Sequence, residues 1–203
     1  MTTSEKYDRI SPKYDRMESM VERLFFRRFR ERALAWIHGD ILEVGVGTGK
    51  NLHYYPSELQ VTGVDFSSGM LRRAQERKEY LGLDRITLIK RDVENLQFPD
   101  NSFDTVISTF VFCTVPNPLR GLVEVYRVLK PGGRAVFLEH MRSRNPVVNF
   151  FLGLMNLYSK SVLGTSMLRK TQENISLSGL NIVLVDNLLL DVVRLIVAEK
   201  QPG

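Results

Sequence analysis

A turn with regularly spaced glycines follows the first apolar strand that the sequence predicts, Ile41–Val44. Gly45, Gly47 and Gly49 stand at alternate positions, so a ligand can lie against backbone that carries no side chain. The turn runs into a predicted helix, whose first amide groups would point toward such a ligand. The segment therefore predicts a binding site for a nucleotide-like ligand.

The glycine spacing differs from that of a dinucleotide site. Such a site carries Gly-x-Gly-x-x-Gly, whereas here the third glycine, Gly49, comes one residue earlier. Glu43, at the end of the preceding strand, would be unfavourable beside a phosphate and favourable beside an ammonium group. We therefore expect a cationic, phosphate-free ligand.

Acids also follow the next two predicted strands. Asp65 follows Val61–Val64, where a carboxylate can accept two hydrogen bonds from a ribose diol. Asp92 follows Ile86–Ile89 and could accept a hydrogen bond from an adenine amino group. The alternative is that both acids cap the following helices. Because open α/β sheets bind ligands at the carboxyl ends of their strands, the ordered series favours one adenosine site.

Apolar strands alternate with helical patterns along the middle of the chain. Hydrophobic periodicity predicts further strands at Thr105–Ser108 and Ala135–Leu138, and helices at Met70–Leu81 and Leu119–Leu129. Such alternation is typical of a parallel sheet covered by helices on both faces.

The two ends of the chain follow different patterns. Met17–Ile37 carries apolar residues at helical spacing, which predicts a long amphipathic helix. Leu180–Val185 and Val192–Ala198 predict two strands joined by a hairpin. This hairpin would place an antiparallel edge on the parallel sheet.

Along most of its length the chain resembles the class I S-adenosylmethionine-dependent methyltransferases. Residues Glu43 to Gly49 match the family's first motif, Asp65 its ribose acid, and Arg91-Asp92-Val93 its adenine-binding segment. Phe103 to Ser108 match the fourth strand, and Val128 to Gly133 match the turn before the fifth.

This resemblance implies an α/β fold: a Rossmann-like, seven-stranded, mostly parallel sheet with an antiparallel last strand, helices on both faces and an N-terminal amphipathic helix as a lid. We expect one domain, 1–203. Residues 1–37 would form the lid and amphipathic helix, 38–140 the cofactor-binding core, and 141–203 acceptor-side helices and a terminal strand pair.

The implied cofactor is S-adenosyl-L-methionine, with S-adenosyl-L-homocysteine as its product. Glu43, Gly45 and Gly47 would face its amino-acid end. Thr109 and Phe110 would lie near its methyl group. The full set of expected cofactor-binding residues is Glu43, Gly45, Gly47, Gly49, Asp65, Phe66, Met70, Asp92, Val93, Thr109 and Phe110.

Methyl transfer depends mainly on positioning and on the exclusion of water, but the acceptor must present a lone pair. An alkyl ammonium with a pKa of about 10 loses its proton at pH 7 at a cost of about 4–5 kcal/mol. His140 is a candidate proton acceptor, or simply a hydrogen-bonded residue at a strand end. Tyr7 and Tyr14 could close over the cofactor and hold a methylated ammonium by cation–π attraction, or pack with their hydroxyls at the surface.

A closer resemblance is to a branch that contains bacterial phospholipid N-methyltransferases, quinone C-methyltransferases and small-thiol methyltransferases. The residues behind it are Tyr7–Tyr14, Phe137–His140, Asn145–Val148, Thr171–Asn174 and Leu195–Lys200. It implies that the acceptor is the amine of phosphatidylethanolamine and of its methylated forms. The alternatives are a quinone precursor carbon, a small thiol, or a regulator that only binds the adenosyl ligand.

The distribution of charge favours a lipid partner. His140 to Lys170 contains five basic residues and no acid, which accounts for the whole formal net charge of +5. Basic residues mixed with apolar ones, here and at Phe25–Arg30, suit an anionic lipid surface better than a nucleic acid. The alternative is a solvated helix face.

Location and metal content follow from simpler features. The chain starts without a signal-peptide pattern, and its longest apolar stretch, near Val147–Leu157, is interrupted by polar residues and glycine. We therefore expect a cytoplasmic protein that contacts the inner face of the membrane. One cysteine and three scattered histidines predict no metal site. The sequence does not indicate an oligomeric state.

Overall fold

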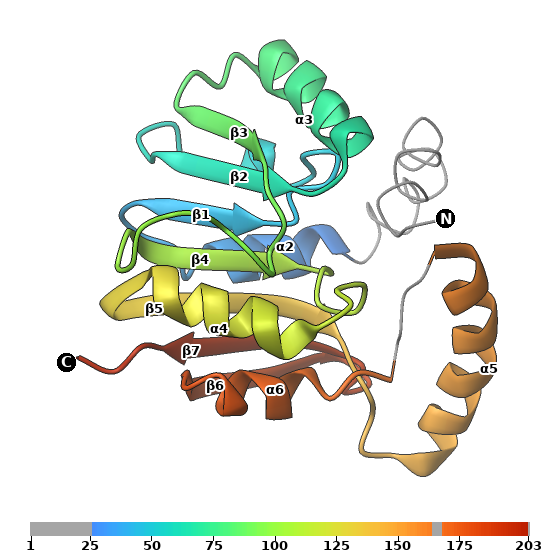
Figure 1. Ribbon diagram of the computed structural model, residues 1–203. Coiled ribbons are helices and arrows are strands. Elements are labelled where there is room, and N and C mark those ends of the chain that lie inside the picture. The colour runs from blue at the N-terminus through green and yellow to red at the C-terminus, as the bar shows by residue number, and fades with distance from the viewer. Residues whose placement is uncertain (1–25, 164–167, 203) are drawn as a thin grey trace.

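A seven-stranded sheet forms the centre of the computed structural model, which describes residues 26–163 and 168–202, with the side chains of 155–163 left out. The strands are β1 (Ile41–Val44), β2 (Val61–Asp65), β3 (Ile86–Lys90), β4 (Phe103–Thr109), β5 (Leu129–His140), β6 (Asn181–Leu189) and β7 (Val193–Glu199). Their order is β3-β2-β1-β4-β5-β7-β6, and β1 to β5 run parallel (Figure 1). β7 is antiparallel to both of its neighbours.

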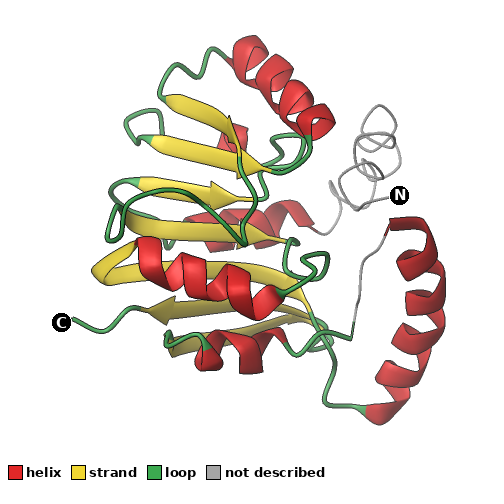
Figure 2. Cartoon of the chain, in the orientation of Figure 1, coloured by secondary structure: helices red, strands yellow, loops and turns green. Residues whose placement is uncertain are grey.

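Helices cover both faces of the sheet, as predicted (Figure 2). On one face, α2 (Arg27–Leu34), α3 (Ser68–Leu81) and the short helix η2 (Leu52–Tyr54) pack on the sheet. On the other face lie α4 (Pro118–Val128) and α6 (Thr171–Leu177). Because both faces are covered, the central strands are largely buried: every residue of β1 is buried, including the charged Glu43.

Local capping sets the helix boundaries. The sequence predicted Met70–Leu81, and α3 begins two residues earlier because the Ser67 hydroxyl accepts a hydrogen bond from the Met70 N–H (3.1 Å). It ends at Gly82, which has a φ of +65°. The helix predicted over Leu119–Leu129 begins at Pro118, with Asn117 as its N-cap. It ends at Val128, and β5 begins at the next residue.

The sequence predicted a helix over Met17–Ile37, and the observed helix ends three residues before the predicted C-terminal end. Residues 17–25 lie outside the described part of the chain, and α2 ends at Leu34. His38 then directs the chain into β1, because its N–H donates to the Thr105 hydroxyl oxygen (3.0 Å) and its carbonyl accepts from that hydroxyl (2.8 Å). The buried Ala33 and Leu34 pack on the sheet. The described half of this amphipathic helix therefore docks on its own sheet, and contact of its exposed face with a lipid surface stays a prediction.

The C-terminal strands form the predicted hairpin, and the last strand, β7, is antiparallel to its neighbours as expected. β7 lies between β5 and β6, so the outer edge of the sheet is β6. The hairpin turns through Leu190 and Asp191, with φ values of 45° and 54°. The Asp191 carboxylate accepts hydrogen bonds from the Ser143 hydroxyl and the Arg144 N–H (2.7 Å), and so ties this turn to the segment before α5.

Helix α5 (Pro146–Leu163) lies on the side toward which the arrows of β1, β2 and β4 point (Figure 1). Its described side chains include four exposed apolar ones: Val147, Phe150, Phe151 and Leu154. Among the described residues, no helix combines the length and the hydropathy that crossing a membrane requires.

Candidate functional site

A pocket of about 230 Å³ opens at the carboxyl ends of the parallel strands. Five residues that the sequence assigned to the cofactor line it: Gly45, Asp65, Phe66, Asp92 and Val93. The other lining residues are Val64, Arg91, Val111, Thr114, Val115 and Pro116. The turn after β1, the ends of β2 and β3, and the loop after β4 therefore meet at one place, as in other open α/β sheets.

Gly45 allows the turn after β1 to approach the loop after β4. Its φ is +68°, and a Cβ atom added there would lie 2.3 Å from Cγ2 of Val111. A side chain at this position would therefore displace one wall of the pocket. Gly47 also has a positive φ, and no side-chain atom lies within 4 Å of an added Cβ.

Asp65 connects two turns at the end of β2. Its carboxylate accepts hydrogen bonds from the Gly47 N–H and the Ser67 N–H, each at 2.9 Å. The side chain is nearly buried yet lines the pocket. This arrangement holds a carboxylate at the strand end where the sequence predicted the ribose acid.

Asp92 is exposed at the rim of the pocket. Its Oδ1 accepts a hydrogen bond from the Glu94 N–H (2.9 Å), which shapes a turn, and no helix begins there. The alternative role of Asp92 as a helix cap is therefore wrong. Arg91, which belongs to the same sequence motif, also lines the pocket.

Glu43 lies in a buried polar network behind the glycine turn. Its carboxylate accepts hydrogen bonds from Asn51 Nδ2 (2.7 Å) and from the Tyr55 hydroxyl (2.8 Å). Arg30 of α2, also buried, donates from Nη1 to Asn51 Oδ1 (2.9 Å) and to the Thr109 hydroxyl oxygen (2.8 Å). The network joins α2, β1 and the end of β4.

Burial raises the pKa of Glu43 to about 7, against the lowering effects of the Tyr55 and Asn51 hydrogen bonds and of the Arg30 charge. Glu43 is not among the residues that line the pocket, nor are Gly47, Gly49, Met70, Thr109 and Phe110. The predicted contact of Glu43 with the ammonium group of the cofactor therefore stays a prediction.

Glu139 organises the loop after β4. It is fully buried, and its Oε1 accepts hydrogen bonds from the Ser108 hydroxyl (2.8 Å), the Val111 N–H (3.0 Å) and the Phe112 N–H (3.2 Å). Val111 is the residue that contacts Gly45, so Glu139 fixes this wall of the pocket. Cys113 in the same loop is buried, and burial raises the pKa of its thiol, which makes it an inert apolar group.

His140 lies in an aromatic cluster. Its ring is 4.6 Å from that of Phe110 and 5.8 Å from that of Phe26, centroid to centroid. Phe110 has a φ of +61°, in the left-handed region that few non-glycine residues adopt. Burial lowers the pKa of His140 to about 4, so the imidazole is neutral at pH 7. A neutral ring can accept a proton, but the same burial disfavours the imidazolium that would result.

Some site residues lie outside the sequence predictions or outside the described chain. Arg30, Asn51 and Tyr55 were missed because each owes its place to contacts between elements distant in sequence, and no local pattern marks them. Tyr7 and Tyr14, the predicted lid residues, lie outside the described residues, and their roles stay predictions.

Comparisons with known proteins identify the family. Residues 42–137 match the family described as "Methyltransferase domain". A phosphatidylethanolamine N-methyltransferase from Cereibacter sphaeroides is 42% identical over 123 residues, which cover 58% of this chain and 61% of that relative. A demethylmenaquinone methyltransferase from Listeria welshimeri is 32% identical over 165 residues, which cover 77% of this chain and 69% of the relative. This chain thus spans about three fifths of the length of the first relative.

A solved structure shares the fold. It is a methyltransferase from Thermotoga maritima, described as a "possible histamine N-methyltransferase", with a TM-score of 0.75 and 21% identity over 97% of this chain and 99% of that one. The chain belongs to the class I S-adenosylmethionine-dependent methyltransferases, as the sequence motifs predicted. S-adenosylmethionine is therefore its cofactor.

Replacing Gly45 by alanine should weaken cofactor binding by about ten-fold or more, because the added Cβ collides with Val111 at a positive φ. Calorimetric titration with S-adenosylhomocysteine measures the affinity. Gly82→Ala is the matched control: Gly82 has a similar φ, but nothing lies within 4 Å of an added Cβ. Parent-like affinity in Gly45→Ala would show that the two loops can separate without cost.

The stability of the protein should depend on pH through Glu139. Burial raises its pKa from 4.5 to about 7, so its contribution to stability is present at low pH and is lost as the pH rises through about 7. Between pH 5 and pH 8, the parent should lose more unfolding free energy than Glu139→Gln, by on the order of 1–3 kcal/mol. Urea unfolding measures the loss. Equal losses would contradict the prediction, since other groups titrate alike in both proteins.

Proposed function

We propose that this chain transfers a methyl group from S-adenosylmethionine to the amine of phosphatidylethanolamine, and of its methylated forms, at the inner surface of the membrane. The observation that carries this proposal is the exposed apolar surface of α5, with Arg142 and Arg144 just before it, on the side toward which the parallel strands point (Figure 1) and where the cofactor pocket opens. The similarity to a protein named phosphatidylethanolamine N-methyltransferase supports it.

The chain's own residues contribute mainly by positioning. Bound S-adenosylmethionine supplies a methyl group on a sulfonium, which is already a good leaving group. Asp65 and Gly45 would orient the adenosyl part, while Glu139 keeps the adjoining wall in place. Positioning of this kind can account for several kcal/mol of the barrier.

The acceptor amine must lose its proton before it is methylated. His140 remains the proposed proton acceptor, because it is neutral at pH 7 and stands at the end of β5. Its low pKa makes it a weak base, so desolvation of the ammonium in the aromatic surroundings of Phe26 and Phe110 would have to assist. Tyr7 and Tyr14 are proposed to close this side.

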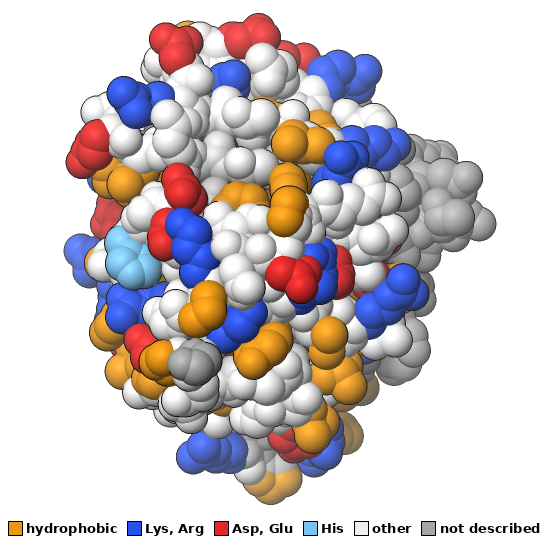
Figure 3. Space-filling model, turned by 60° about the vertical axis from the view of Figure 1, so that its left-hand side comes forward, with side chains coloured by type: hydrophobic (Ala, Val, Ile, Leu, Met, Phe, Trp, Pro, Cys, Tyr) orange, Lys and Arg blue, Asp and Glu red, His pale blue; other side chains and the backbone are white. Residues whose placement is uncertain are grey.

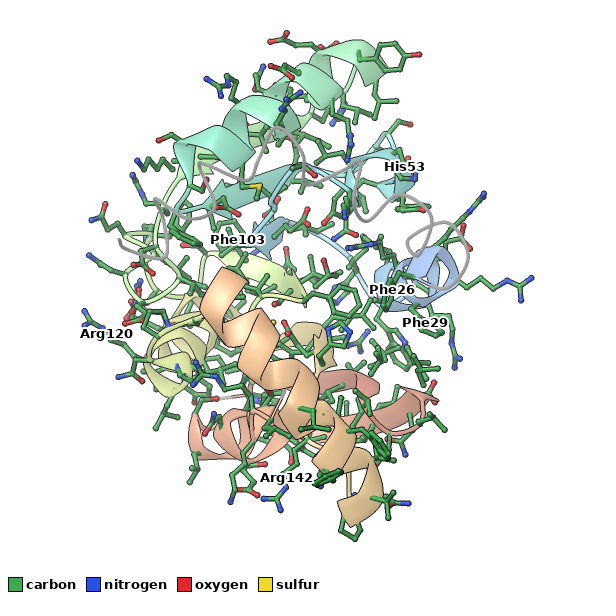
Figure 4. All side chains as sticks on the ribbon, turned by 90° about the vertical axis from the view of Figure 1, so that its right-hand side faces the viewer. Phe26, Phe29, His53, Phe103, Arg120 and Arg142 are labelled. Atoms are coloured by element: carbon green, nitrogen blue, oxygen red, sulfur yellow. The ribbon has the colours of Figure 1, made fainter. Side chains whose placement is uncertain are left out.

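The α5 surface fits an anionic lipid interface. Val147, Phe150, Phe151 and Leu154 are each more than half exposed. Arg142 and Arg144, also exposed, lie just before the helix, and Figure 4 shows Arg142 beside its start. Apolar side chains flanked by cations are the composition that binds at a headgroup boundary.

A quinone precursor is the second candidate acceptor. The aromatic cluster of Phe26, Phe110 and His140 offers a neutral, ring-lined wall that suits a flat apolar molecule. The similarity to a protein named demethylmenaquinone methyltransferase supports this alternative. A small thiol, or ligand binding without catalysis, remains a further alternative that no contact favours.

Incubation with labelled S-adenosylmethionine and separate acceptors tests the proposal. Label should enter phosphatidylethanolamine and its monomethyl and dimethyl forms, because their amines are the proposed nucleophiles. Demethylated quinone, small thiols and free ethanolamine serve as competing acceptors. Label in the quinone alone would replace the proposal with the second candidate, and no label in any acceptor would favour a regulator.

Vesicles that contain phosphatidylglycerol should sediment the protein, and less so at high salt, because exposed charges are screened. The double variant Phe150→Ser with Phe151→Ser should bind about ten-fold more weakly, since two exposed rings no longer insert. Val123→Ser with Leu177→Ser removes exposed apolar side chains elsewhere and should bind as the parent does. Equal sedimentation of all three proteins would contradict the role of α5.

A further inference from the structure

A second, larger pocket of about 590 Å³ lies between the segment before α5 and the start of α6. Five of its lining residues are cationic: Arg142, Arg144, Arg169, Lys170 and Arg194. The lining contains one acid, Glu173. By contrast, Lys and Arg side chains are interspersed with Asp and Glu on the face shown in Figure 3, which lies at the amino ends of the parallel strands.

The positive charge of this pocket exceeds what its acids neutralise. Glu173 pairs with Lys170 (2.9 Å), and Asp191 just outside the lining pairs with Arg194 (3.4 Å). Arg142 and Arg144 form no ion pair within the described part of the chain, and both are exposed. Burial is the main reason why the pKa of Arg194 lies below its usual value, and the positive charge of Arg144 adds to this lowering.

Two buried polar atoms on the same wall lack a hydrogen-bond partner among the described residues. They are Nε of Arg169 and the hydroxyl oxygen of Thr171, and Thr171 is almost fully buried. Buried donors and acceptors in folded proteins are normally satisfied, so an unsatisfied pair in a pocket wall calls for an explanation. A ligand with several acceptor oxygens would provide one.

The basic pocket adjoins the cofactor pocket. Arg169 lines the basic pocket, and its Nη2 donates a hydrogen bond to the Val115 carbonyl (3.0 Å). Val115 lines the cofactor pocket. Met141, on the basic side, directly follows His140 of the aromatic cluster. The Arg169–Val115 hydrogen bond therefore joins a wall of the basic pocket to a wall of the cofactor pocket.

We propose that the basic pocket binds a phosphate group, with Arg142 and Arg144 as its principal ligands. Guanidinium groups match phosphate oxygens in paired hydrogen bonds, and they carry the charge that a phosphodiester or a phosphate ion requires. If the proposed function holds, on which this part rests, the group is the phosphate of the lipid acceptor. Two carbons separate that phosphate from the amine, so phosphate binding would place the amine beside the cofactor.

Calorimetric titration at constant ionic strength tests the site directly. The probes are inorganic phosphate, glycerophosphoethanolamine and ethanolamine, added to the full chain. The parent should bind the first two and not the third. Arg142→Gln with Arg144→Gln should weaken both by about ten-fold or more, because two charged hydrogen-bond donors are lost. Arg72→Gln with Arg85→Gln removes two exposed arginines outside the pocket, and should bind as the parent does.

The outcomes separate the site from its occupant. Binding of inorganic phosphate alone supports the site with a free phosphate as its ligand, whereas preference for glycerophosphoethanolamine supports the lipid. The proposal is overturned if the parent binds no phosphate. It is also overturned if the Arg142 and Arg144 variant binds phosphate as tightly as the parent does. Circular dichroism confirms that the variants are folded.

Kinetics distinguish failure of the site from failure of the proposed function. In the variant Arg142→Gln with Arg144→Gln, the KM for phosphatidylethanolamine in micelles should rise, while the KM for S-adenosylmethionine stays unchanged. Phosphate binding in a parent that methylates no lipid would refute the proposed acceptor and leave the site standing. Lipid methylation with an unchanged KM in the variant would overturn the site alone.

Discussion

The cofactor edge depends on one close approach, that of the turn after β1 to the loop after β4. At Gly45 there is no room for even one more carbon, because Val111 occupies the space. Val111 is held there by a hydrogen bond from its N–H to the buried Glu139. The pocket wall is thus set by a carboxylate on β5, two strands away from the glycine turn. Both packing at Gly45 and hydrogen bonding to Glu139 thus act on the position of Val111.

Two buried carboxylates, Glu43 and Glu139, frame this edge at considerable energetic cost. Burial raises both pKa values to about 7, and donors from Asn51, Tyr55 and the loop after β4 offset part of the cost. Such networks restrict the backbone to one arrangement. A reaction that depends on placing two reactants in line benefits from a rigid rim, since it needs little other chemistry from the protein.

The alternating strands and helices could be predicted from the sequence, because local hydrophobic patterns encode them. Strand ends, the glycine turn and Asp65 follow from apolar runs and spacing, and the structure places them at one edge. Arg30 could not be assigned, because an arginine in an amphipathic helix normally faces water, and only α2 docking buries it. The basic segment showed its charge in the sequence, but the pocket that gathers Arg142, Arg169 and Arg194 depends on the hairpin and α6.

The Arg144 N–H donates a hydrogen bond to the Asp191 carboxylate (2.7 Å), so the segment just before α5 is anchored and would be the pivot of any swing of the helix. The helix has 18 residues. Its length is therefore about 27 Å, and a swing of about 10° about the pivot would carry its far end through about 5 Å. A small displacement of the β6–β7 turn would thereby be amplified at the opposite end of α5. The far end of α5 would therefore shift by several ångströms while the start of the helix stays anchored at Asp191.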